Sequence, residues 1–207
     1  MLKATKPAGV ILVGGRSSRM GVTHKALLDL KVQPLLAHVI ARLQTQTGLL
    51  VLSCESKTDA FDEFGLPVVP DLLPQHRGPL TGLYSALQYL ADSGENNGLV
   101  LCPCDAPFIP DNLVQTLLDT HQRDTESVVV VSYQGVLQPT FSMWQNHHLP
   151  AIDDAVVNRG MGGLKHVLRS LPHMIVEWPP TEPTPFFNVN TPADLQTAKT
   201  WLDRLPA

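Results

Sequence analysis

The clearest indication of the fold is the segment Gly9-Val10-Ile11-Leu12-Val13-Gly14-Gly15-Arg16-Ser17-Ser18-Arg19. Its first five residues form an apolar run with the length of a buried strand, and two glycines follow at once. Adjacent glycines let a backbone approach a ligand closely, and their successive N–H groups can surround an anion. Arg19 and Lys25 add two cations that suit phosphate groups. We therefore expect a phosphate-binding loop at the carboxyl end of a first strand.

The spacing of this loop matches neither the G-x-G-x-x-G fingerprint of dinucleotide-binding proteins nor the P-loop, because no Lys-Ser or Lys-Thr follows a glycine at the required distance. A Gly-Gly pair alone is more typical of a flexible surface loop. The position directly after a strand, together with the two cations, favours the binding loop.

Short apolar runs alternate with helical patterns through the first part of the chain. This alternation is typical of βαβ units and a largely parallel sheet. The strands are expected at 9–13, 49–54, 66–69 and 98–103, and the helices at 34–46, at 79–91 and after a capping Asp111.

The alternation of strand and helix patterns ends near residue 125. Residues 128–133 and 136–144 flank a Gln134–Gly135 turn and predict a hairpin, so one antiparallel excursion is expected. Two short helices, a strand over 174–178 and a helix capped by Thr191 follow. The predicted fold is α/β: a single Rossmann-like domain over residues 1–207, with a mostly parallel sheet and a short antiparallel excursion.

The composition of the chain disfavours some classes of binding partner and indicates a cellular compartment. Lys and Arg number 15 against 19 Asp and Glu, for a net charge of −4, which disfavours a general nucleic-acid binder. Three cysteines argue against a disulfide framework and favour a reducing compartment. No apolar run approaches the length of a membrane span, so we expect a cytoplasmic protein without a membrane partner.

Two aspartates follow predicted strands, where open α/β sheets form their ligand crevice. Asp71 comes after the strand at 66–69, and Asp105 ends the apolar run at 98–103 between two prolines. A carboxylate at such a position suits Mg²⁺, which prefers oxygen ligands and bridges to substrate phosphates. Asn188 and Asn190 are two residues apart, so in an extended strand both would share one face. Each of these residues also has a plain reading as a solvated turn or helix cap.

The string Leu-Val-Gly-Gly-Arg-Ser-Ser-Arg-Met-Gly over residues 12–21, with Lys25 behind it, resembles the signature loop of the nucleotidyltransferases of molybdenum cofactor biosynthesis. The resemblance extends through Asp71, the Cys-Pro-Cys-Asp string ending at Asp105, and Asn188 to Asn190. It implies transfer of GMP from GTP to the molybdopterin molybdenum cofactor, with release of pyrophosphate and with Mg²⁺ as the cofactor. It also leaves room for transient contact with other cofactor-biosynthesis proteins or with molybdoenzymes.

The resemblance also implies roles for individual residues. The expected metal ligand is Asp105, and the expected catalytic residues are Arg19, Lys25 and Asp105. The N-terminal half is expected to bind the nucleotide, through Leu12, Val13, Gly14, Gly15, Lys25, Ser53, Asp71, Gly82 and Asp105. The C-terminal half is expected to bind the acceptor, through Asn188, Asn190, Arg159 and Lys165; the last two belong to the glycine-rich, basic segment 158–165.

Three positions depart from the pattern of the family and keep alternatives open. Val13 stands in place of a usual Ala, Ser53 in place of a common Asn, and Gln138 in place of a usual His before Pro-Thr. Val13 and Ser53 flank the expected base pocket, so a cytidylyltransferase that uses CTP is the first alternative. A sugar-phosphate nucleotidylyltransferase and a non-catalytic nucleotide or cofactor carrier are more remote ones.

Overall fold

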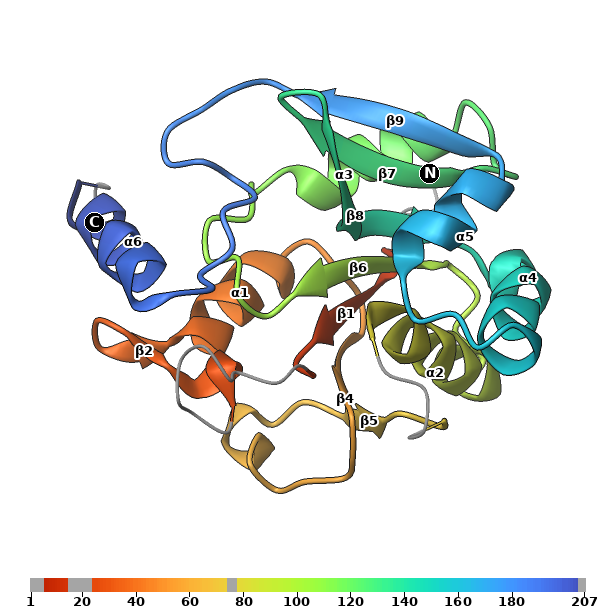
Figure 1. Ribbon diagram of the computed structural model, residues 1–207, viewed down its shortest axis with the longest axis horizontal. Helices are drawn as coiled ribbons and strands as arrows, with labels where there is room; N and C mark the ends of the chain where they lie inside the picture. The colour runs from red at the N-terminus through yellow and green to blue at the C-terminus, as the bar shows by residue number, and fades with distance from the viewer. Residues whose placement is uncertain (1–5, 15–23, 74–77, 205–207) are drawn as a thin grey trace.

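A computed structural model describes residues 6–14, 24–73 and 78–204. Its centre is a seven-stranded sheet with the order β5-β4-β1-β6-β8-β7-β9 (Figure 1). The strands are β1 (Ala8–Leu12), β4 (Leu50–Cys54), β5 (Val68–Pro70), β6 (Leu99–Pro103), β7 (Val128–Tyr133), β8 (Val136–Trp144) and β9 (His173–Trp178). Strand β8 pairs antiparallel with both of its neighbours, whereas the other pairings in this sheet are parallel. The mostly parallel sheet with one antiparallel excursion is therefore confirmed.

Helices cover both faces of the sheet (Figure 1). On one face the buried side chains of β1, β4 and β6 pack against α1 (Leu35–Leu43) and α3 (Leu113–His121). On the other face they pack against α2 (Pro79–Asp92), α4 (Leu149–Asp153), the π-helical turn η4 (Asp154–Asn158) and α5 (Leu164–Ser170). Adjacent residues of a strand point to opposite faces, which is why Val10 and Ile11 belong to different clusters.

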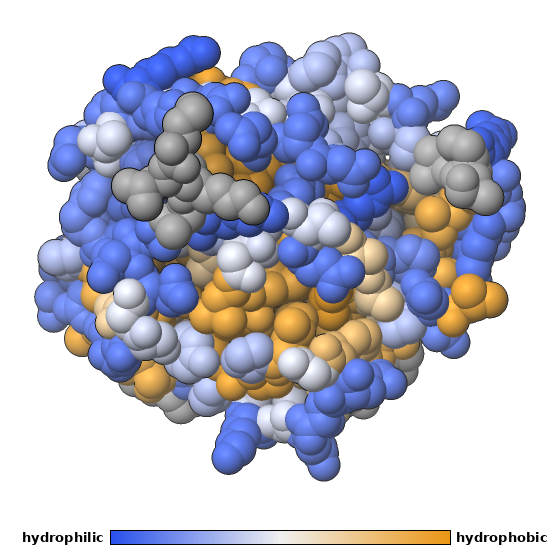
Figure 2. All heavy atoms as spheres, turned by 180° about the vertical axis from the view of Figure 1, so that it is seen from behind, coloured by the Kyte–Doolittle hydropathy of each residue, from blue (hydrophilic) through white to orange (hydrophobic). Residues whose placement is uncertain are grey.

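A third, smaller cluster joins the last helix, α6 (Pro192–Arg204), to a two-stranded sheet of β2 (Asp29–Leu30) and β3 (Gln33–Pro34). Short 3₁₀ turns complete the described chain: η1 (Lys25–Leu27), η2 (Asp62–Phe64) and η3 (Asn146–His148). Figure 2, which views the molecule from behind, shows apolar residues gathered across the middle of that face with hydrophilic residues around them. In the described parts of the chain, none of the helices has the length and apolar composition to cross a bilayer.

The start of α6 follows its sequence pattern closely. The Asp194 N–H donates to the Thr191 hydroxyl at 3.2 Å, and the Asp194 carboxylate accepts from the N–H groups of Asn190 and Thr191. This reciprocal capping fixes the chain immediately before the helix. The expected cap of α3 is different, because Asp111 pairs with Arg42 instead. The side chain of Gln46 accepts the Val114 N–H in the first turn of α3.

The three cysteines are free and buried, as expected for core residues. Cys102 and Cys104 belong to the same core cluster, and burial raises the pKa of both thiols far above the ordinary value. Protonated, buried thiols are poor nucleophiles and poor metal ligands. Their part here is to fill the core beneath the loop that carries Asp105.

Candidate active site

A cavity of about 500 Å³ opens at the carboxyl edge of the sheet, over the ends of β5, β4, β1 and β6. It is lined by Leu12, Val13, Gly14, Lys25, Ser53, Cys54, Glu55, Asp71, Gly78, Pro79, Gly82, Pro103, Cys104, Asp105, Thr140 and Asn190. We call it the edge pocket. Nine residues that the sequence nominated for the nucleotide, the metal or the acceptor line it: Leu12, Val13, Gly14, Lys25, Ser53, Asp71, Gly82, Asp105 and Asn190. Gly15 and Arg19 lie outside the described residues.

Backbone hydrogen bonds carry the parallel pairing past the strand ends. The Val13 N–H donates to the Ser53 carbonyl at 2.9 Å, and the Cys104 N–H donates to the Leu12 carbonyl at 3.1 Å. The loops after three neighbouring strands therefore leave the sheet at one level. This is how residues far apart in sequence come to share one wall of the edge pocket.

One end of the edge pocket holds a half-buried charge pair. The Lys25 ammonium contacts one carboxylate oxygen of Asp105 and donates to Asn190 Oδ1 at 2.7 Å. The side chains of Lys25 and Asp105 are 15% and 16% exposed, so water screens this pair less than a surface pair. We call this region the phosphate end, because it supplies a cation of the kind that substrate phosphates require.

Two buried oxygen atoms have no hydrogen-bond partner among the described residues: Asp105 Oδ1, in this pair, and Asn188 Oδ1, in the segment that precedes Asn190. Buried acceptors normally find a partner, so each such atom indicates a missing ligand or water. Carboxylate and amide oxygens are the donors that Mg²⁺ prefers. Within the described ranges, no cluster of three His, Cys, Asp or Glu side chains could hold a metal. A cation here would therefore rely on one carboxylate, amide oxygens and the phosphates of a substrate, which suits Mg²⁺.

Val189 places the two asparagines. Its side chain is fully buried in the small cluster beneath α6, and its N–H donates to the Asp105 carbonyl at 2.9 Å. Asn190 thereby reaches Lys25 and the edge pocket. Asn188 does not line the pocket, although its amide oxygen is buried. The segment is irregular rather than the extended strand that the spacing suggested, because it is anchored to a loop and not to a neighbouring strand.

The opposite end of the edge pocket is built from close-packed backbone, and we call it the nucleoside end. A Cβ added at Gly82 would lie 2.7 Å from the Ser53 hydroxyl and 2.7 Å from Leu12 Cδ2. Gly78 has φ of +128°, and a Cβ there would lie 2.5 Å from the Gly162 carbonyl oxygen. Both glycines are needed because neighbouring chain leaves no space for a side chain.

Asp71 is held from both sides. Its N–H donates to the Cys54 carbonyl at 2.8 Å, and the next N–H, that of Leu72, donates to the Ser85 hydroxyl at 2.9 Å. Ser85 is almost fully buried on α2 and donates in turn to the Thr81 carbonyl. Burial, together with the negative charge of Glu55, raises the pKa of the Asp71 carboxyl to about 6.

The start of α2 is less open to a ligand than helix starts usually are, although free N–H groups at such a position can meet an anion. Instead the Leu80 N–H donates to the Gly162 carbonyl at 3.2 Å, and the Thr81 N–H donates to the Gly78 carbonyl at 3.1 Å. The loop before α5 therefore closes this helix end.

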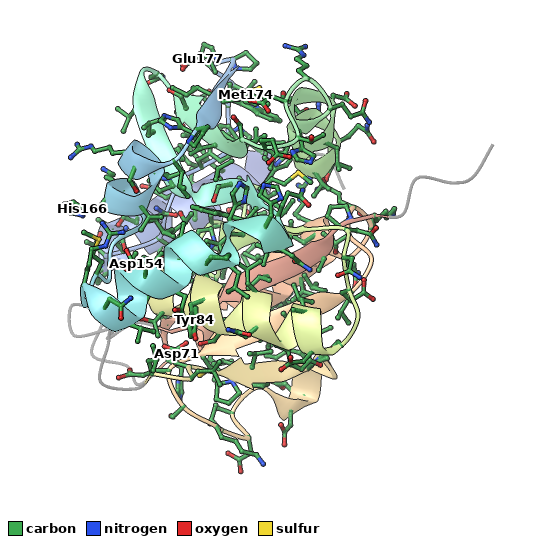
Figure 3. The ribbon with its side chains drawn as sticks, turned by 90° about the vertical axis from the view of Figure 1, so that its right-hand side faces the viewer. Asp71, Tyr84, Asp154, His166, Met174 and Glu177 are labelled. Carbon is green, nitrogen blue, oxygen red and sulfur yellow. The ribbon has the colours of Figure 1, made fainter. Side chains whose placement is uncertain are left out.

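Arg159 and Lys165, the weaker acceptor candidates, do not line the edge pocket. Arg159 pairs with Asp154 at 3.0 Å, both side chains being well exposed, and Lys165 is exposed on α5. Figure 3 shows Asp71 on one side of α2, and Asp154 and His166 in the α4–α5 region on the other. The role of the two basic residues at the acceptor stays a prediction that the geometry of the edge pocket does not support.

Several lining residues were missed in the sequence. Glu55 follows β4 at the sheet edge, so the rule that found Asp71 and Asp105 could have found it too. Thr140 gave no such signal. It belongs to an irregularity in β8, where Gln138 pairs with Val131 and Ser142 already pairs with Val130. This bulge turns Thr140 toward the edge pocket beside β6, and bulges often re-aim side chains in this way.

The fold and the site together define a class: an α/β protein of the nucleotidyltransferase type, with a pocket at the carboxyl edge of its sheet that is lined by charged and amide side chains. The model of the MobA-like NTP transferase domain matches residues 9–175, and the chain belongs to that family. Molybdenum cofactor guanylyltransferases are among its relatives. The one from Cupriavidus metallidurans is 34% identical over 92% of this chain and 93% of its own. The one from Rhizobium leguminosarum is 35% identical over 97% of this chain and 95% of its own.

Solved structures agree on the fold. Molybdopterin-guanine dinucleotide biosynthesis protein A from Archaeoglobus fulgidus superposes with a TM-score of 0.80 at 19% identity, covering 96% of this chain and all of its own. CMP:2-keto-3-deoxy-manno-octonic acid synthetase complexed with CTP superposes with a TM-score of 0.70 at 16% identity, covering 97% of this chain and 99% of its own. The fold is thus shared by proteins whose names imply different nucleotides.

Proposed function

We propose that the protein transfers GMP from GTP to the molybdopterin molybdenum cofactor, with Mg²⁺ as cofactor. An oxygen of the acceptor phosphate attacks the α-phosphorus of GTP, the bond from that phosphorus to the bridging β-oxygen breaks, and pyrophosphate leaves. The observation that carries the proposal is the phosphate end, where Lys25, Asp105 and Asn190 converge over the strand ends. Relatives of more than 30% identity, named for this activity, supply the identity of the substrates.

Residues at the two ends of the edge pocket would contact different parts of the substrate. Asp71, Ser53 and Gly82 lie at the nucleoside end over β5 and β4. Lys25 would neutralise charge on the phosphates, and Asp105 with the asparagine oxygens would hold Mg²⁺. That ion, when bound, neutralises the charge that builds up on the phosphates. The acceptor phosphate is already ionised and needs no general base, so catalysis rests on positioning and charge neutralisation.

Guanine suits this nucleoside end for a chemical reason. An ionised carboxylate accepts hydrogen bonds and donates none. Guanine offers a ring N–H and an amino group side by side, whereas cytosine offers its amino group beside a ring nitrogen that needs a donor. Asp71, ionised above about pH 6, therefore favours GTP over CTP.

The test is pyrophosphate release by the purified protein with Mg²⁺ and molybdopterin, in parallel reactions with GTP and CTP. We expect release with GTP and little with CTP. Preferential use of CTP would support the cytidylyltransferase alternative, and release with a hexose 1-phosphate in place of molybdopterin would support the sugar-nucleotide one. Nucleotide binding without release from any acceptor would indicate a carrier.

Two further expectations belong to this proposal. The three buried, free thiols suit the reducing cytoplasm, where the cofactor is expected to be processed. Contacts with cofactor-biosynthesis proteins or molybdoenzymes would be transient, at the mouth of the edge pocket where the product leaves. Co-purification from a cell extract, with and without GTP, would test them.

A further inference from the structure

Lys25 holds an unusual position among the described cations. Its ammonium group contacts Asp105 and Asn190 at the same time, at the point where these two oxygen ligands converge. Both partners in the ion pair are largely shielded from water. The ammonium group therefore occupies the place of the positive charge that this oxygen cluster requires.

A lysine satisfies this oxygen cluster only in part. Lys25 contacts one oxygen of Asp105, while Asp105 Oδ1 remains buried without a partner among the described residues. A divalent cation takes about six oxygen ligands at short distance, so it could satisfy more of these oxygens than one ammonium group can. The cluster is more complementary to a divalent cation than to Lys25.

From this geometry we propose that Lys25 is a stand-in for the divalent cation in the nucleotide-free protein. By pairing with Asp105, Lys25 lowers the affinity of the free protein for the cation. When a nucleoside triphosphate binds, the phosphates attract Lys25 away from Asp105 and free the carboxylate. Nucleotide and cation then bind cooperatively. This inference rests on the proposed function, because it takes Asp105 to be the metal ligand.

The length of the lysine side chain makes the exchange possible. Four flexible methylene groups let its charge move several ångströms without any movement of the backbone. Lys25 lies in the short turn η1 at the rim of the edge pocket, so both Asp105 and bound phosphates are within its reach. A plain structural ion pair would predict something else: loss of Lys25 would reduce stability and leave cation affinity unchanged.

The experiment is a titration with Mn²⁺ alone, in the absence of nucleotide, in which free Mn²⁺ is measured by electron paramagnetic resonance. We expect Lys25→Met to bind Mn²⁺ about tenfold more tightly than the wild-type protein, within the usual range of coupling between two sites. Lys31→Met is the matched control. It also removes a lysine paired with an aspartate, Asp203, but at the exposed β2–β3 turn, and it should leave Mn²⁺ affinity unchanged.

A double-mutant cycle with Asp105→Asn shows whether the gain runs through this carboxylate. We expect Asp105→Asn to weaken Mn²⁺ binding and Lys25→Met to confer no gain in its presence. Lys25→Gln, which retains a hydrogen-bond donor without the charge, replaces Lys25→Met if the latter unfolds; circular dichroism checks each variant.

Two results would overturn the stand-in role, and they differ in what else they affect. If Asp105→Asn weakens Mn²⁺ binding but neither Lys25 variant strengthens it, Lys25 is a structural partner and the proposed function survives. If Asp105→Asn has no effect on Mn²⁺ binding, Asp105 is not the metal ligand, and the metal assignment falls together with the stand-in role.

Discussion

The two ends of the edge pocket are built on different principles. At the phosphate end, Lys25, Asp105 and Asn190 are charged or polar side chains that can exchange partners. At the nucleoside end, Gly78 and Gly82 let backbone and core side chains approach so closely that nothing can be added. A substitution at the phosphate end should therefore affect turnover with little effect on folding. A substitution at the nucleoside end should affect folding and nucleotide affinity together.

The largest effect is expected at Asp105. Asp105→Ala should reduce guanylyl transfer at least about a thousandfold, because the metal ligand and the partner of Lys25 are both lost. The backbone carbonyl that holds Val189 is retained, so thermal unfolding should change little. Asp111→Ala, which breaks the exposed pair with Arg42, is the control for activity. A fully active Asp105→Ala enzyme would remove the distinction between the two ends.

Gly78 offers the sharpest test at the nucleoside end. Gly78→Ala places a Cβ against the Gly162 carbonyl at a positive φ, and we expect it to lower the free energy of unfolding by about 3 kcal/mol. Gly94→Ala is the matched control at the other end of α2. Its φ is also positive, at +77°, but no atom lies within 4 Å of the added Cβ, so we expect about 1 kcal/mol. Equal losses in urea unfolding would mean that close approach to Gly162 is unimportant.

Asp71 belongs to the nucleoside end but carries a charge. A change of pH can therefore remove the charge of Asp71 without changing the side chain. Its pKa of about 6 lies above the ordinary 3.8, so it is ionised at pH 7.5 and loses its charge as the pH falls through 6. GTP affinity should fall over the same range. Asp71→Asn should bind GTP about tenfold more weakly at pH 7.5, as expected for a lost charged hydrogen bond. It should also lack this part of the pH dependence.

Phosphate groups of GTP titrate near pH 6 as well, but in both proteins alike, so the difference between the two profiles isolates Asp71. Because folding raises this pKa, the ionised carboxylate destabilises the folded state above about pH 6, and the penalty disappears below 3.8. Asp71→Asn should therefore be more stable than the wild type at pH 7.5, by on the order of 1 kcal/mol once solvent screening of this half-buried group is included, and nearly equal to it near pH 4. Parallel affinity profiles in the two proteins would exclude a nucleotide-contacting Asp71.

The smallest effect is expected at Ser85, which positions Asp71 from α2. Ser85→Ala leaves the Leu72 N–H without its acceptor and should cost about 1 kcal/mol of stability. It should also raise the KM for GTP about fivefold, less than the tenfold effect expected for Asp71→Asn, with kcat nearly unchanged. Ser93→Ala is the control, since Ser93 makes the same bond to the carbonyl four residues earlier but is exposed. A KM that moves equally in both variants would mean that Ser85 is only structural.

The sequence alone predicted residues of both ends of the edge pocket: Lys25, Asp105 and Asn190 at the phosphate end, and Ser53, Asp71 and Gly82 at the nucleoside end. The strand ends could be predicted to meet because the carboxyl ends of parallel strands share one edge of a sheet.

What escaped prediction depends on contacts between distant segments. The bulge that aims Thr140, the closure of α2 by Gly162 and the capping of α3 by Gln46 each join elements remote in sequence. The acceptor role of Arg159 and Lys165 stays a prediction. The fold gives Arg159 an acidic partner and leaves Lys165 at the surface, outside the edge pocket.

The bond from the Val189 N–H to the Asp105 carbonyl has a consequence for synthesis of the chain. The family match ends at residue 175, yet Asn190, which completes the contacts of Lys25, comes later and is brought into place by this bond. Strands β1 and β6 can pair long before that point. A nascent chain therefore presents an unfinished pocket until residue 190 has left the ribosome, and a product that stops earlier would lack the last polar group of the phosphate end.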